Sequence, residues 1–152
     1  MPPPPQLIKL LHGISSAAPA KAVFAGGCFW SMESAFEKVK GVVSVVSGFA
    51  GGKTPHPTYD QVSMGGTGHR ESVEVTYDPA KVTYGQLVDV FWHNIDPLDP
   101  AGQFCDKGQE YLAAIFWRDA EQRRIAELSL ANVKRKFGAK NVWTDVLPAG
   151  PF

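Results

Sequence analysis

Residues 21–40 begin with a short apolar run typical of a strand and continue with apolar residues spaced as in a helix. Residues 21–25 form a short apolar run that stops at the glycine pair Gly26-Gly27. Beyond it, apolar side chains recur at spacings of three, four and three residues, at Phe29, Met32, Phe36 and Val39. Lysines in the last turn and Gly41 behind them are typical of a helix C-terminus. The pattern predicts a strand, a sharp bend at Cys28 and an amphipathic helix.

Two further strands and a second helix are predicted in the middle of the chain. Residues 42–49 are apolar and β-branched, and residues 70–77 alternate between apolar and polar before Asp78-Pro79. Thr83 followed by Gln86 is a capping box, which indicates a helix that continues through Phe91.

The last part of the chain predicts a strand, a long helix and a final strand. Residues 111–117 ("YLAAIFW") and 141–147 are the strand candidates, and Asp119 caps a helical segment that runs to about Phe137, with Gly138 after it. Residues 50–69 and 96–110 lack periodicity and are rich in glycine, proline and polar side chains. Loops of this length in a compact domain are usually either functional or disordered.

The predicted order of residues 21–117 is β-α-β-β-α-β, which is the order of the split-βαβ, ferredoxin-like unit. A further helix and strand are appended. We therefore expect an α+β two-layer sandwich, with helices on one face of a mostly antiparallel sheet. Residues 1–20 are predicted to be a flexible proline-rich tail, and residues 21–152 a single domain.

Composition excludes several classes of function. The 152 residues are 44% hydrophobic, enough for one domain with a core. Fifteen basic and fifteen acidic residues cancel, so no net field favours nucleic acid or an anionic membrane as a partner. No apolar run reaches the roughly 18 residues that a membrane span requires.

The two cysteines, Cys28 and Cys105, form neither a disulfide framework nor a CxxC motif. The four histidines show no paired spacing, so a metal site is not expected. No cofactor is expected either. This usage favours a thiol-based cytoplasmic enzyme. The alternative is an exported form, because Ala18-Pro19-Ala20 has the small residues of a signal-peptide cleavage site, although the segment before it has no basic start.

Cys28 and Glu71 are the candidates for chemistry on residue type and position. A cysteine at the start of a helix meets backbone N–H groups and the positive end of the dipole, which lower the pKa of a thiol. The alternative is a buried cysteine that only fills space. His69 could serve Cys28 as a general base, and Glu71 could be a general acid if burial raises the pKa of its carboxyl.

Five motifs occur in order along the chain: "GGCFW" at 26–30, "GFAGG" at 48–52, "PTYDQV" at 57–62, "TGHRESVEVTYDP" at 67–79 and "DKGQEY" at 106–111. Together they resemble the peptide methionine sulfoxide reductases of type A, which act on the S epimer. The resemblance covers about residues 21–148. It implies an elaborated ferredoxin-like sandwich, and thiol-dependent reduction of methionine sulfoxide, free or in proteins, as a repair of oxidised proteins.

The resemblance also implies roles for individual residues. Cys28 would attack the sulfoxide sulfur and become a sulfenic acid, and Glu71 would protonate the departing oxygen. Tyr59 and Tyr111 would hydrogen-bond that oxygen, and Asp106 would orient the polar side of the site. An apolar wall for the S-methyl group would come from Phe29 and Trp30.

The chain departs from the family's usual pattern in ways that concern recycling and substrate contacts. Resolving cysteines near the C-terminus are lacking, and the C-terminal segment is short. Cys105, beside Asp106, is a candidate resolving thiol. Otherwise an external thiol such as thioredoxin, glutaredoxin or glutathione would reduce Cys28. Ser31 stands where glycine or cysteine is common, and Phe49 replaces a frequent tyrosine.

Two other functions stay open on the sequence. The first is a cysteine hydrolase or acyl transferase that uses Cys28 with His69 and does not need Glu71. The second is a non-catalytic module that binds sulfoxides or peptides without turnover. We expect the protein to be a monomer without a nucleic-acid or membrane partner.

Overall fold

The computed structural model describes residues 18–52, 58–59, 61, 68–99, 102–103, 106–150 and 152. Its helices and strands, in chain order, are β1 (Ala20–Ala25), α2 (Phe29–Glu37), β2 (Val42–Ala50), β3 (Arg70–Tyr77), α4 (Tyr84–His93), β4 (Gly102–Gln103), β5 (Asp106–Lys107), the 3₁₀ turn η1 (Gln109–Tyr111), β6 (Ala114–Trp117), α5 (Ala120–Phe137), the 3₁₀ turn η2 (Ala139–Asn141) and β7 (Asp145–Pro148). The predicted tail, residues 1–20, lies mostly outside the described residues.

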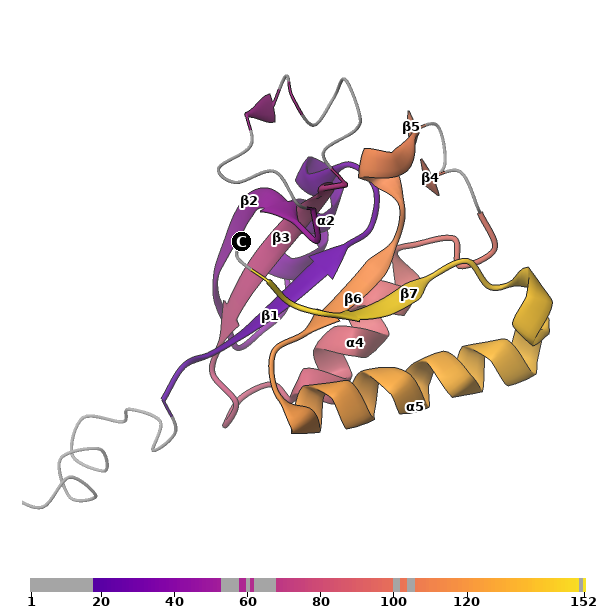
Figure 1. The fold of residues 1–152 in the computed structure, drawn as a ribbon. Coiled ribbons are helices and arrows are strands. Elements are labelled where there is room, and N and C mark those ends of the chain that lie inside the picture. The colour runs from indigo at the N-terminus through magenta and orange to yellow at the C-terminus, as the bar shows by residue number, and fades with distance from the viewer. Residues whose placement is uncertain are drawn as a thin grey trace, which may run out of the picture.

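Five strands form one sheet in the order β2-β3-β1-β6-β7 (Figure 1). The pairs β1–β3, β1–β6 and β2–β3 are antiparallel, and only β6–β7 is parallel. Without β7, the sheet order β2-β3-β1-β6 is that of a ferredoxin-like sheet, in which β3 separates β2 from β1. The predicted α+β sandwich with an appended helix and strand is confirmed.

The helices cover one face of this sheet, and α2 and α4 lie behind it in Figure 1. Alternate strand residues enter the main core on that face, where Phe24 stacks on Phe36 and Phe91 with centroids 4.9 and 5.5 Å apart. The other face carries a smaller apolar cluster around Val23 and Phe116. Because successive side chains in a strand point to opposite faces, the position of a residue relative to these core residues tells which face its side chain occupies.

Both predicted helix N-caps are present. The Thr83 hydroxyl accepts from the N–H of Gln86, whose side chain accepts in return from the N–H of Thr83, which completes the capping box. The Asp119 carboxylate accepts from the N–H of Gln122 and so caps α5, and Gly138 ends that helix with a positive φ of 91°. These local signals fixed the starts of α4 and α5 because each satisfies backbone donors that the helix itself leaves without partners.

The structure corrects the predicted strand at 111–117. Tyr111 belongs to the turn η1, in which its N–H donates to the carbonyl of Gly108 at 3.1 Å, and β6 begins only at Ala114. Gly108 has a φ of 136°, a conformation that glycine adopts without strain, and it turns the chain out of the sheet direction. The predicted loop before it contains the short antiparallel pair of β4 with β5.

The last strand also begins later than predicted, at Asp145 rather than residue 141. The N–H of Trp143 donates to the carbonyl of Pro97 at 2.7 Å, so this backbone is bonded to the loop after α4 instead of to β6. None of the helices in the described ranges has the length and apolarity that a bilayer crossing demands.

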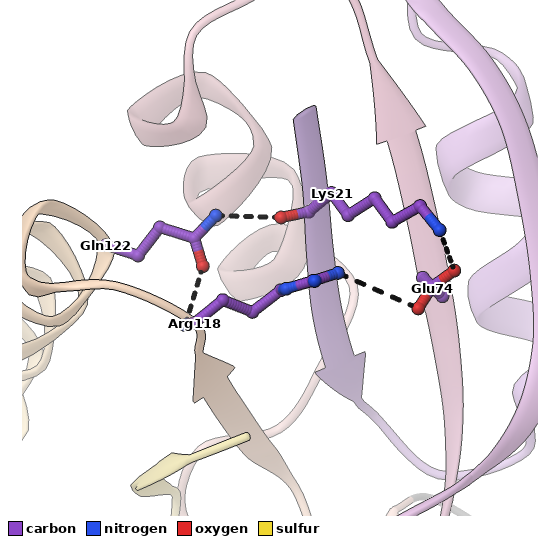
Figure 2. Close-up of polar contacts among 4 residues, drawn as sticks. All are labelled: Lys21, Glu74, Arg118 and Gln122. Carbon is purple, nitrogen blue, oxygen red and sulfur yellow. Dashed lines mark hydrogen bonds and ion pairs between the residues drawn. The ribbon is translucent and has the colours of Figure 1, made fainter. Parts of the chain in front are cut away.

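Four polar residues form a network of contacts at the end of the sheet where β1 begins (Figure 2). The side-chain amide of Gln122 donates to the carbonyl of Lys21 at 2.8 Å and accepts from the N–H of Arg118 at 3.0 Å. Glu74 lies 3.3 Å from the Lys21 ammonium and 3.9 Å from the Arg118 guanidinium. These contacts join β1, β3, β6 and the start of α5, at the end of the sheet opposite to Cys28.

Candidate active site

Cys28 lies where β1 turns into α2. It is the N-cap residue, with extended backbone (φ −60°, ψ 122°), and its carbonyl accepts from the N–H groups of Ser31 and Met32 at 3.1 and 3.3 Å. Its side chain is half-buried and carries a free thiol. The predicted position at a helix N-terminus is confirmed, so the thiol sits beside the positive end of the helix dipole.

The two glycines before Cys28 are required by space and by conformation. A Cβ at Gly26 would lie 2.6 Å from the sulfur of Met32, and one at Gly27 would lie 2.7 Å from the Cβ of Gln103. Gly27 also has a φ of 89°. Only glycine lets the backbone bend this tightly against its neighbours, so "GG" is a packing requirement of the turn that presents the thiol.

Gln103 supports this turn, a role that no pattern in the sequence indicates. It is 2% exposed, and its side-chain amide forms two hydrogen bonds with the backbone of Asp96, accepting from the N–H at 2.5 Å and donating to the carbonyl at 2.7 Å. The residue thereby fastens β4 to the loop after α4 while its Cβ rests on Gly27. A glutamine in an aperiodic segment gives no signal of such a contact.

Glu71 lies on the face and at the end of the sheet where α2 begins. Val73, Val75 and Tyr77 of β3 all enter the core beneath the helices, so the alternation of side chains puts Glu71 on the same face. Phe24 of β1 pairs with Val73, and in this antiparallel register Gly26, just beyond the end of β1, comes opposite Glu71 near the start of β3. Glu71 is therefore beside the glycine turn, and it is only 2% exposed.

Tyr111 and Tyr59 complete the polar side of the site. The Tyr111 hydroxyl hydrogen-bonds the carboxyl group of Glu71, and Tyr59 is close enough to contribute to the raised pKa of Tyr111. Burial first, then the negative charge of Glu71 and the hydrogen bond to it, raise the pKa of Tyr111 to about 12. Tyr111 therefore keeps its proton and remains a hydrogen-bond donor at neutral pH.

Aromatic side chains border these polar groups. Phe49 is the cross-strand partner of Glu71, and its ring centroid lies 6.4 Å from that of Tyr59. Trp30 in the first turn of α2 is 70% exposed, a high value for the largest apolar side chain. In the sequence Phe49 stands out only as a departure from a family pattern, and the structure places it beside Glu71 and Tyr59.

His69 is engaged in holding the backbone. It is 6% exposed, and its Nδ1 accepts from the N–H of Gly52 at 3.2 Å. An Nδ1 that accepts this backbone hydrogen bond cannot at the same time accept a proton from Cys28. This geometry does not favour the hydrolase hypothesis.

Three of the predicted site features cannot be placed by the structure. The side chains of Phe29 and Asp106, and the whole of Cys105, lie outside the described residues. The backbone of Asp106 pairs with Gln103 in the β4–β5 pair. The predicted roles of these three residues stay predictions.

The chain is similar in sequence to proteins of one known family. A model of the family described as "Peptide methionine sulfoxide reductase" matches residues 20–152. The peptide methionine sulfoxide reductase MsrA of Bacillus licheniformis is 45% identical over 136 residues, covering 86% of this chain and 73% of that protein.

Solved structures agree with the sequence comparisons. Methionine sulfoxide reductase A of Corynebacterium diphtheriae superimposes with a TM-score of 0.75 at 35% identity, over 86% of this chain and 64% of that chain. The reduced form of Mxr1 from Saccharomyces cerevisiae gives a TM-score of 0.82 at 26% identity, over 91% of this chain and 80% of that chain.

Proposed function

The chain belongs to the peptide methionine sulfoxide reductases, and from this premise we propose how its own residues reduce the sulfoxide. The observation that carries the proposal is the placement of Glu71. This buried carboxyl group, hydrogen-bonded to Tyr111, lies beside the glycine turn that presents Cys28. A nucleophile and a proton donor are thus available at one end of the sheet.

We propose that the Cys28 sulfur attacks the sulfur of a methionine S-sulfoxide and that the sulfoxide oxygen, once protonated, passes to Cys28. The methionine sulfur is reduced by two electrons, its bond to oxygen breaks, and Cys28 is oxidised to a sulfenic acid. The start of α2 supports this role because Cys28 is the N-cap residue, at the positive end of the helix dipole, and its half-buried thiol is free.

Glu71 supplies the proton that the departing oxygen needs, and Tyr111 assists it. A carboxyl group taken out of water favours its neutral form, so burial prepares Glu71 to act as an acid. Tyr111 stays protonated and can donate to either the carboxyl oxygen or the sulfoxide oxygen. Tyr59 would hydrogen-bond the same oxygen, and Asp106 would orient the polar side of the site.

The aromatic border binds the methyl group of the substrate. We propose that Trp30 and Phe29 form the wall for the S-methyl group, with Phe49 as a third aromatic on the β2 side. The high exposure of Trp30 suits a surface that becomes covered when a substrate binds. Holding the methyl group in one orientation would leave the oxygen of only one epimer facing Glu71.

A second thiol must return Cys28 to its reduced form. Cys105 comes two residues after Gln103, which rests against Gly27, and we propose it as the resolving cysteine, with thioredoxin as the reductant of the resulting disulfide. Mxr1 of S. cerevisiae has been seen in a complex with Trx2. Because catalysis needs a reduced thiol, we propose that the protein acts in a reducing compartment such as the cytoplasm.

Single-turnover reduction of each sulfoxide epimer by the reduced protein tests this proposal, with methionine and free thiols counted afterwards. We expect one mole of methionine per mole of protein from the S epimer and none from the R epimer. Loss of two thiols would support Cys105 as the resolving residue, and loss of one would leave an external thiol in that role. Binding without methionine formation would overturn the proposal, as would full activity in a Cys28→Ser variant.

A further inference from the structure

Arg70, the first residue of β3, joins three strands at the end of the sheet that holds the site. Its Nη1 donates to the carbonyl oxygen of Ala113 at 2.9 Å, and its Nη2 donates to Oδ2 of Asp145 at 2.7 Å. Ala113 directly precedes β6, and Asp145 begins β7. The Arg70 side chain is only 11% exposed, so these are the contacts of a largely buried cation.

The sheet leaves room for this side chain to reach across. Arg70 is next to Glu71 in the strand, so it occupies the opposite face of the sheet, away from the helices. β1 lies between β3 and β6, and it ends at Ala25, which pairs with Ala114 and is followed by Gly26-Gly27. No long side chain of β1 stands between Arg70 and Ala113.

Two hydrogen bonds therefore join the same two segments, one on each face of the sheet. Glu71 bonds Tyr111 on the helix face, and Arg70 bonds Ala113 on the other. The partners are one residue apart on β3 and two residues apart in the segment 111–113. We propose that Arg70, held by Asp145, is a positioning residue that keeps the Tyr111 hydroxyl against Glu71, an inference that rests on the proposed roles of these two.

The segment that carries Tyr111 depends on such a fastening. It is a single 3₁₀ turn that follows Gly108, and residues 112–113 belong to no strand. The carbonyl of Ala113 also accepts from the N–H of Asp145 at 3.2 Å, so Arg70, Ala113 and Asp145 form a closed set. Charge-assisted bonds from a guanidinium are stronger and more directional than neutral ones, and one lysine ammonium cannot reproduce the fork.

A double-mutant cycle in the full chain tests the inference, using Arg70→Gln and Tyr111→Phe separately and together. The readout is the rate constant of single-turnover reduction at saturating S-sulfoxide. We expect Arg70→Gln to lower it about tenfold, because one charged hydrogen bond to the segment is lost. In the Tyr111→Phe background the same change should cost no more than about twofold, because the hydroxyl that it positions is absent. Arg70→Lys should restore only part of the rate.

The matched control is Arg118→Gln, which removes the guanidinium that lies 3.9 Å from Glu74 on the same sheet face but at the end opposite to Cys28. Its rate constant should equal that of the parent protein. Thermal unfolding of each variant shows that it is folded. If Arg70→Gln gives no folded protein, Asp145→Asn takes its place in the cycle, since it loosens the guanidinium through a half-exposed partner.

Equal losses from Arg70→Gln in both backgrounds would overturn the inference, because Arg70 would then act independently of Tyr111. An unchanged rate in Arg70→Gln beside a slow Tyr111→Phe would overturn it too, while leaving the proposed chemistry standing. An unchanged rate in Tyr111→Phe would instead remove that residue from the proposed mechanism, and this inference would fall with it.

Discussion

The hydroxyl group of Tyr111 is hydrogen-bonded to the carboxyl group of Glu71, although the two residues are forty positions apart and only Glu71 belongs to the sheet. The contact puts a neutral donor and a buried acid next to each other, at the end of β1 where Cys28 follows a glycine turn. It is the relationship on which the proposed proton transfer depends.

Glu71→Gln should keep the fold and lose the chemistry. The amide is nearly the same size as the carboxyl group but has no proton to give to the oxygen, so single-turnover reduction should slow by about 10²–10⁴-fold. Glu74→Gln is the control, because Glu74 is in the same strand on the opposite face. Quenched-flow measurement of methionine formation decides the matter, and a parental rate in Glu71→Gln would remove the acid assignment.

Alkaline titration should detect Tyr111 as a late-ionising phenol. Its pKa is raised to about 12, and the charge of Glu71 contributes to the shift. In Glu71→Gln the pKa of Tyr111 should therefore fall toward the usual value of about 10. Tyrosinate absorbance measures this pKa, and subtraction of the Tyr111→Phe curve isolates the one residue. An unchanged pKa of Tyr111 in Glu71→Gln would contradict the contact between the two residues.

The same shift predicts a pH dependence of stability. Folded Tyr111 holds its proton to about pH 12, whereas an unfolded tyrosine releases it near pH 10. The contribution of Tyr111 is therefore complete below about pH 10 and is lost as the pH rises to about 12. The free energy of unfolding, measured with urea between these two pH values, should fall more steeply with pH for the parent protein than for Tyr111→Phe. Parallel curves would show that the phenol is not protected.

Gly27→Ala should destabilise the protein. The new Cβ would meet that of Gln103 at 2.7 Å, and a φ of 89° is unfavourable for alanine, so we expect a loss of about 1–3 kcal/mol in the free energy of unfolding. Gly85→Ala in α4 is the matched control, since a Cβ at this position would have no neighbour closer than 3.8 Å. That change should stabilise by about 0.4–1 kcal/mol. Urea denaturation compares the two, and equal effects would mean that the turn tolerates a side chain.

Cys105→Ser tests the proposed resolving thiol. The first turnover should keep its rate, because Cys28 performs the chemistry, but thioredoxin-dependent steady-state turnover should fall, since no Cys28–Cys105 disulfide can form for it to reduce. The thiol count after one turnover should show a loss of one thiol in the variant and two in the parent. Unchanged thioredoxin-dependent turnover in Cys105→Ser would assign the recycling step to an external thiol acting directly on Cys28.

The sequence by itself determined the elements whose cause is local. The caps at Thr83 and Asp119, the strand of alternating residues at 70–77 and the bend at Gly26-Gly27 all follow from neighbours within a few positions. Their order gave the sheet topology, and the motifs around Cys28 and Glu71 gave the family and the chemistry.

Only the tertiary structure decided how the site is held together. That Gln103 supports the glycine turn, that Phe49 faces the site across from Glu71, and that Arg70 reaches Ala113 depend on strand pairing between distant segments. No local pattern encodes these contacts, because each residue would satisfy its own position in many ways. Tyr111 shows the difference most clearly: its apolar neighbours predicted a strand, and a glycine three residues earlier turned it instead toward Glu71.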